Sequence, residues 1–116
     1  MEGNQNFGEI FNIMMSEPMN KLCIDCKRPY PLFASINNAV FLCETCSHGH
    51  QQLGKQISYI RGLKDEWDEY LLLYMARGGN SRFLNTMNFY EMDDEERISK
   101  YNTEGIQNYR LRVNAL

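Results

Sequence analysis

The sequence holds its four cysteines in two equally spaced pairs, Cys23-Ile-Asp-Cys26 and Cys43-Glu-Thr-Cys46, with 16 residues between the pairs. No further cysteine occurs in the 116 residues. A two-residue gap lets one turn direct both sulfurs at the same ion, and a tetrahedral zinc ion with four thiolate ligands accounts for both pairs and for the loop between them. The pattern therefore predicts one structural Zn²⁺ bound by Cys23, Cys26, Cys43 and Cys46.

Disulfide bonds and iron are the alternatives to zinc. Structural disulfides require an oxidising compartment, and we see no export signal, because the apolar stretch 10–15 is interrupted by Asn12 and has no Lys or Arg before it. A single redox-active pair would leave the second pair unexplained. Iron bound by the same four cysteines stays open as the main other metal.

Two histidines, His48 and His50, follow closely after Cys46. Four thiolates already close a tetrahedral coordination sphere, so we expect the ion to stabilise the fold and not to bind a substrate. We therefore expect the histidines to lie outside the ligand set, where a ring N–H could donate to a zinc-bound sulfur.

Composition and charge exclude several classes of protein. Hydrophobic residues make up 43% of the chain and charged residues 23%, which is typical of a globular protein. No apolar run approaches the roughly 18 residues of a membrane span. A dedicated nucleic-acid-binding domain carries an excess of basic residues, whereas this chain has 12 basic and 15 acidic residues, so we expect no nucleic-acid partner. We interpret residues 1–116 as a single domain with a finger core over 23–46 and a helical remainder over 47–116.

Hydrophobic spacing predicts a small sheet surrounded by helices. Apolar residues recur at intervals of three and four in several segments, as on one face of a helix. We expect Asn80 to cap one of these helices and the acidic run 91–96 to form a solvated turn or helix start. The fold class is therefore predicted to be α+β, a small zinc-finger sheet with a four-cysteine site and several α-helices around it. The segments are helices over 6–17, 44–53, 67–77, 80–87 and 103–115, a buried strand over 40–42 and a weaker strand over 56–63.

The residues around the cysteines resemble the zinc finger of the Arf GTPase-activating proteins, a family with the same spacing of two cysteine pairs. The resemblance continues beyond the finger and covers about residues 8–116. It implies the same fold class, with the four-cysteine finger sheet among helices. The matching stretches are 23–26, Pro29, Pro31, 33–35, Asn37, 40–47, 53–54, 57–58, 60–61, Trp67, 79–80 and 110–116.

The resemblance also implies a function and a site. Members of the family bind Arf-type small GTPases in their GTP form and accelerate hydrolysis, in vesicle traffic and commonly at the Golgi. In the family, an arginine five positions after the last zinc cysteine acts as an arginine finger, which neutralises charge on the phosphoryl group in the transition state. In this chain that position is Gln51.

Replacement of the arginine by Gln51 predicts weak or lost arginine-finger chemistry. A guanidinium is always charged and offers a fork of donors, whereas a carboxamide donates hydrogen bonds without charge. Charge-assisted hydrogen bonds are about twice as strong as neutral ones. Lys55 and Arg61 are the nearest basic residues in the sequence that could supply the missing charge.

Further expectations complete this interpretation. His50, Arg61 and Asn80 are expected to line the surface that faces the GTPase. We expect a monomer that regulates hydrolysis by its partner and is not an enzyme itself. The sequence has no lipidation motif and no polybasic cluster, so we expect a cytoplasmic protein that reaches Golgi or vesicle membranes through the GTPase.

Three alternatives stay open from the sequence. The chain could be a catalytically silent module that binds an Arf-type GTPase as a scaffold. GATA-type nucleic-acid-binding fingers have a similar four-cysteine layout, but they carry a basic tail that this chain lacks. A ubiquitin-ligase-like zinc module needs a second metal site, and four cysteines with two histidines cannot supply the usual eight ligands.

Overall fold

The computed structural model of the protein describes residues 2–90 and 98–115. Its centre is a three-stranded antiparallel sheet of order β2-β1-β3, formed by β1 (Phe33–Ser35), β2 (Val40–Leu42) and β3 (Ile60–Gly62). Ala34 of β1 pairs with Phe41 on one side and with Arg61 on the other. All three residues of β2 are fully buried, so this edge of the sheet forms the middle of the hydrophobic core.

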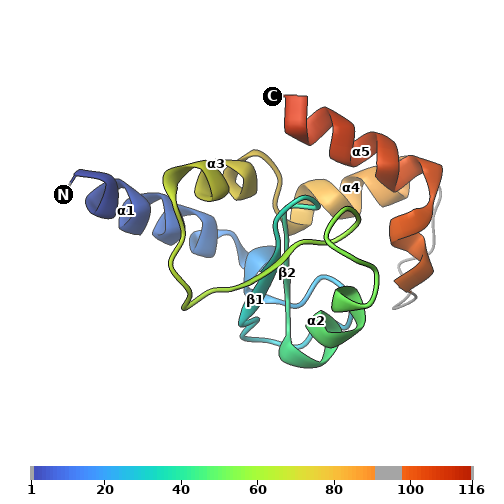
Figure 1. The fold of residues 1–116 in the computed structure, drawn as a ribbon, viewed down its shortest axis with the longest axis horizontal. Coiled ribbons are helices and arrows are strands. Elements are labelled where there is room, and N and C mark those ends of the chain that lie inside the picture. Colours follow the sequence, from blue (N-terminus) through green and yellow to red (C-terminus); the bar gives the residue numbers. More distant parts are fainter. Residues whose placement is uncertain (1, 91–97, 116) are drawn as a thin grey trace.

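Helices surround the sheet, as the hydrophobic spacing predicts (Figure 1). The helix α2 (Glu44–Gln51) packs on β1 and β3, below the sheet in this view, and α3 (Glu69–Arg77) lies above it against α1 (Glu2–Ser16). The helix α4 (Asn80–Phe89) contacts β2 and α5 (Glu104–Ala115). Two short 3-10 helices, η1 (Pro18–Lys21) and η2 (Ile98–Asn102), lead into the finger and into α5. No helix among the described residues is both long and apolar enough to cross a bilayer.

The arrangement confirms the predicted α+β class, a small sheet beside four clustered cysteines with helices around it. Several predicted boundaries are wrong. The weak strand shrinks to Ile60–Gly62, and a strand at Phe33–Ser35 forms where the turn-rich sequence predicts none. Trp67 lies ahead of α3, because Asp68 caps this helix by accepting the Leu71 N–H at 2.8 Å. The acidic run 91–96 lies outside the described residues.

Asn80 does not cap α4, which corrects the prediction for this residue. Gly79 is the N-cap, with a positive φ of 103° that favours glycine. The Asn80 side chain turns inward and is fully buried. Its amide oxygen accepts the Phe41 N–H at 2.9 Å, and its amide nitrogen donates to the carbonyls of Met19 and Leu22, each at 2.8 Å. One side chain thus joins α4 to β2 and to the entrance of the finger.

Replacement of Asn80 by alanine is expected to destabilise the fold. It leaves the Phe41 N–H and the Leu22 carbonyl without partners, whereas the Met19 carbonyl keeps the Leu22 N–H at 3.3 Å. Such orphaned groups cost about 1–3 kcal/mol each. We expect the free energy of unfolding of Asn80→Ala, measured by urea denaturation, to fall by about 3 kcal/mol. Asn85→Ala, an exposed asparagine on the same helix, is the matched control and should change little. An equal effect of the two substitutions would contradict this role of Asn80.

Candidate metal centre and its buried polar network

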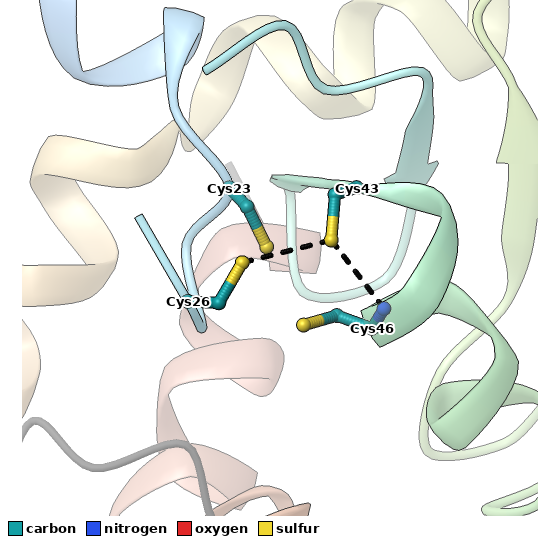
Figure 2. A group of neighbouring side chains, drawn as sticks. All are labelled: Cys23, Cys26, Cys43 and Cys46. Carbon is teal, nitrogen blue, oxygen red and sulfur yellow. Dashed lines mark hydrogen bonds between the residues drawn. The ribbon is translucent and has the colours of Figure 1, made fainter. Parts of the chain in front are cut away.

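The four cysteine sulfurs form one cluster between the start of the finger and the start of α2 (Figure 2). All four Sγ atoms lie within 4.8 Å of one another, and those of Cys26 and Cys43 are 3.6 Å apart. Four sulfurs at about 2.3 Å from a tetrahedral zinc ion would lie about 3.8 Å from each other. The separation therefore fits a shared ion and is much longer than a disulfide bond of about 2.05 Å.

Local backbone structure places each pair of sulfurs. The first pair lies in a tight turn in which Cys23 N–H donates to the Arg28 carbonyl and Lys27 N–H donates to the Cys23 carbonyl, at 2.8 and 2.9 Å. The second pair lies at the N-terminus of α2, where Cys43 is the N-cap and its sulfur accepts from Cys46 N–H at 3.5 Å. A helix N-terminus favours negative charge, so this placement suits thiolate ligands.

A cation would stabilise the deprotonated form of this cluster. Burial, together with the neighbouring Cys23 and Cys43, raises the pKa of the Cys46 thiol well above its usual range. Four thiolates at these distances would repel one another in the absence of a positive ion. The donor set is one that zinc, and also iron, uses in proteins, so the residues fit the predicted metal and leave its identity between these two.

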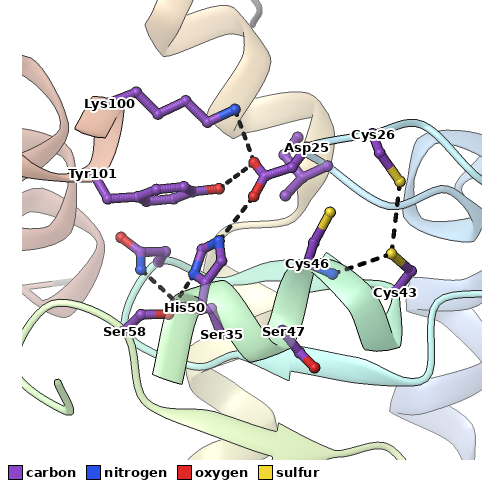
Figure 3. Close-up of polar contacts among 12 residues, drawn as sticks. Asp25, Cys26, Ser35, Cys43, Cys46, Ser47, His50, Ser58, Lys100 and Tyr101 are labelled. Atoms are coloured by element: carbon purple, nitrogen blue, oxygen red, sulfur yellow. Dashed lines mark hydrogen bonds and ion pairs between the residues drawn. The ribbon is translucent and has the colours of Figure 1, made fainter. Parts of the chain in front are cut away.

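Next to the cysteines, Asp25 is the centre of a buried polar network (Figure 3). This carboxylate lies between the first two cysteines in the sequence and is 4% exposed. It accepts from His50 Nε2 at 2.8 Å, from the Tyr101 hydroxyl at 2.7 Å and from Lys100 Nζ at 2.8 Å. Burial raises the pKa of Asp25, but the bond from His50 and the charge of Lys100 outweigh burial and leave this pKa below its ordinary value. Asp25 is therefore charged and fully partnered.

His50 connects this network to the sheet. Its ring is fully buried, contacts the Tyr101 ring edge-on with centroids 4.3 Å apart, and shares a hydrogen bond between Nδ1 and Ser58 Oγ at 2.7 Å. Ser58 Oγ in turn lies 2.6 Å from Ser35 Oγ of β1. The last turn of α2 is thus bound to the finger, to the sheet and to the C-terminal segment through one imidazole.

The structure changes the roles predicted for His50 and Asn80. Both are predicted to face a GTPase, but both side chains are fully buried and have no surface to offer a partner. His50 also bonds to Asp25 and Ser58 and not to a cysteine sulfur. The second histidine, His48, is exposed on α2.

Gln51 and Arg61 differ in exposure and in their hydrogen bonds. Gln51 is the last residue of α2 and is exposed, directly after the anchored His50. Arg61 of β3 is half-buried, and its guanidinium donates to the Glu66 carbonyl and to the Tyr59 hydroxyl. Lys55 is exposed, with its Nζ 6.0 Å from the centroid of the Tyr59 ring. Lys55 and Arg61 are the two basic residues that could supply the missing charge. Of these two, only Arg61 has its charged group fixed by hydrogen bonds to other described residues.

Sequence reasoning missed the residues that complete the network. No spacing rule identifies Asp25, Ser58, Lys100 or Tyr101, because they meet only in the folded chain. The one available signal is Asp25 itself, a charged residue enclosed between two predicted metal ligands.

Comparisons with known proteins agree with the predicted family and with the fold. A family model described as "Putative GTPase activating protein for Arf" matches residues 8–113. ADP-ribosylation factor GTPase-activating protein 3 is 38% identical in Bos taurus and 36% identical in Mus musculus, each over 97% of this chain and 22% of the relative. The chain thus spans about a fifth of the length of these relatives.

Solved structures show the same fold. A crystal structure of a Cryptosporidium parvum protein, described in the same terms as the family model, superposes with a TM-score of 0.84 at 26% identity and covers 96% of this chain and 90% of its own. The ArfGap domain of HIV-1 Rev binding protein has a TM-score of 0.66 at 13% identity, over 96% of this chain and 84% of its own. The second likeness concerns the fold alone.

These relatives overturn one expectation, that the chain is not an enzyme. They are named for activating GTP hydrolysis, and a protein that accelerates a reaction is a catalyst even when the nucleotide is bound to its partner. An arginine supplied in trans by a GTPase-activating protein stabilises the transition state on the nucleotide of its partner. From its sequence match and its fold, the chain belongs to the family of GTPase-activating proteins for Arf.

Proposed function

We propose that this chain binds an Arf-family GTPase in its GTP form and accelerates hydrolysis weakly, through the surface at the end of α2. The observation that carries the proposal is the placement of Gln51. This residue is exposed at the end of a helix whose first turn holds two cysteines of the metal centre and whose last turn is fixed by the buried His50. This helix, held at both ends, supports the proposal because it brings to the surface the residue that we assign to the arginine position of the family.

The resident ion is proposed to be zinc, held by Cys23, Cys26, Cys43 and Cys46. It supplies no reacting group, because four protein ligands leave no open coordination position. Its effect is structural, since it joins the turn of the first cysteine pair to the start of α2. Zinc is proposed over iron because the cysteines match a family whose finger binds zinc.

The chemistry at Gln51 limits the proposed activity. A carboxamide N–H can donate to a phosphate oxygen and can help to orient the nucleotide, but it brings no positive charge to the transition state. Arg61 keeps its charge, but its guanidinium is bound to the carbonyl of Glu66 and the hydroxyl of Tyr59, so we propose that it stays on the fold and does not reach the nucleotide of the GTPase. Lys55 is exposed four positions after Gln51 and is the residue left to compensate.

A second candidate function is a scaffold that binds the GTPase without stimulating it. The same observation, a neutral residue at the arginine-finger position, favours it. In both cases we propose a monomeric, cytoplasmic protein that acts in vesicle traffic and reaches Golgi or vesicle membranes through its membrane-bound partner. The excess of acidic over basic residues gives no reason to propose a nucleic-acid partner.

Substitution of Gln51 by arginine tests whether the missing positive charge limits the stimulation of GTP hydrolysis. We expect Gln51→Arg to raise single-turnover hydrolysis by a GTP-loaded Arf-family GTPase at least about tenfold over the native chain, because an arginine finger contributes roughly 10³–10⁵ in such systems. Gln52→Arg adds the same charge one residue further along, at another exposed position, and should have little effect. Equally strong stimulation by the native chain and by Gln51→Arg would contradict the proposal. Capture of the GTPase without stimulation by the native chain would favour the scaffold.

Removal of the metal tests the proposed cofactor. We expect the purified chain to contain one zinc per molecule, and a strong chelator to unfold the finger, because structural zinc contributes apparent binding energies of roughly 10–16 kcal/mol. Loss of tertiary structure is measured by near-ultraviolet circular dichroism, with re-addition of Zn²⁺ as the control for reversibility. A chain that retains its signal and thermal midpoint after complete metal removal would contradict a structural role, and a stoichiometric iron content would contradict zinc.

A further inference from the structure

The carboxylate of Asp25 connects the last turn of α2 to the 3-10 helix η2 through two different oxygens (Figure 3). Its Oδ2 accepts from His50 Nε2 at 2.8 Å, whereas its Oδ1 accepts from the Tyr101 hydroxyl at 2.7 Å and from Lys100 Nζ at 2.8 Å. Because a carboxyl group is rigid and planar, it cannot turn away from the donors on Oδ1 without also moving Oδ2. The donors from η2 therefore fix the orientation in which Asp25 meets His50.

The direction of the last turn of α2 depends on His50. The helix has 8 residues, and a helix this short has little stability of its own. His50 anchors the turn from inside the protein, because its ring is fully buried and bonds at Nε2 to Asp25 and at Nδ1 to Ser58. Gln51 follows His50 directly and is exposed. A shift of the imidazole therefore shifts the backbone that carries the Gln51 side chain.

Tyr101 and Lys100 are themselves held in place. The Tyr101 side chain is fully buried, and its ring stacks on Phe83 of α4 with centroids 5.5 Å apart and meets the His50 ring edge-on at 4.3 Å. Lys100 is 5% exposed and brings a positive charge to the buried carboxylate. A fully bonded polar network in the interior rigidifies the groups within it. Tyr101 thus acts on Asp25 across a sequence separation of 76 residues.

We propose that Tyr101 and Lys100 are positioning residues, which act through Asp25 and His50 to hold residue 51 where it reaches the nucleotide of the GTPase. The inference rests on the proposed function of the surface at the end of α2. It adds that η2, which lies outside both the finger and α2, sets the geometry of that surface. Misplacement of a reacting group by about 1 Å costs up to about 10²-fold in rate, so the loss of one bond at η2 is expected to be measurable at residue 51.

The first measurement is the order parameter of the Gln51 backbone amide, from ¹⁵N relaxation of the metal-loaded chain. Tyr101→Phe removes the hydroxyl and keeps the buried ring. We expect an order parameter of about 0.85 in the native chain, as in rigid backbone, and below about 0.6 in Tyr101→Phe, as in flexible backbone. The amide of Phe41, in the buried strand β2, should stay rigid in both and serves as the internal reference.

Tyr109→Phe is the matched control. Tyr109 is also a buried tyrosine beside Phe83, with ring centroids 5.5 Å apart, but its hydroxyl has no hydrogen-bond partner among residues 2–90 and 98–115. The substitution removes a hydroxyl from the same region without removing a bond to Asp25. It should therefore leave the order parameter of Gln51 unchanged.

The second measurement is the stimulation of GTP hydrolysis, with Gln51→Arg as the parent chain so that residue 51 carries a charge. In single-turnover assays with a GTP-loaded Arf-family GTPase, we expect added Tyr101→Phe to lower the maximal rate about tenfold and to change the half-saturating concentration of the chain by less than about twofold. A displaced finger loses transition-state stabilisation, whereas the binding surface stays. Lys100→Gln should act in the same direction, and Lys100→Arg, which keeps the charge beside Asp25, should retain most of the rate.

The two measurements separate this inference from the proposed function. If Gln51→Arg does not stimulate hydrolysis, the proposed function fails, while local loosening of Gln51 in Tyr101→Phe still supports the control of residue 51 by η2. A Gln51 amide that is equally ordered in the native chain and in Tyr101→Phe would overturn the inference, as would equal loosening in Tyr109→Phe. A stimulating Gln51→Arg chain whose maximal rate is unchanged by Tyr101→Phe would overturn it too, because the hydroxyl would then stabilise the fold alone.

Discussion

The convergence of four cysteine sulfurs is the constraint on which the rest of the structure depends. It fixes two segments that are otherwise held by short strands and tight turns, the finger entrance at Cys23 and the first turn of α2 at Cys43. A chain of 116 residues buries a modest core, so a metal bound by four thiolates adds stability that side-chain packing alone would not provide. The same constraint sets where α2 begins and hence where its last residue, Gln51, reaches the surface.

A second layer of interactions extends this constraint to the far end of the chain. Asp25 lies within the first cysteine turn and pairs with Lys100 and Tyr101, and Arg110 of α5 donates to the Asn38 side chain at 2.9 Å. Removal of one partner from a buried charged pair costs about 3–5 kcal/mol, because an uncompensated charge is left in the interior. The C-terminal elements therefore contribute to the shape of the finger although none of them supplies a metal ligand.

The sequence allowed the metal cluster and most helices to be predicted, because both depend on local spacing. Cysteine gaps and apolar intervals of three and four are visible without knowledge of the fold. The roles of His50 and Asn80 could not be predicted, since each depends on partners distant in the sequence. Asn80, for example, bonds to Met19 and Phe41. The strand at Phe33–Ser35 was missed for the same reason, as its pairing with β2 and β3 overrides a turn-rich composition.

X-ray absorption at the zinc edge of the purified chain tests the central claim, that one zinc ion joins the two cysteine pairs, most directly. The proposed zinc site predicts a single shell of four sulfur atoms at about 2.3 Å from zinc and no nitrogen or oxygen ligand. A shell that contains imidazole or water, fewer than four sulfurs, or a chain that carries no zinc would contradict the arrangement from which the positions of α2 and Gln51 are derived.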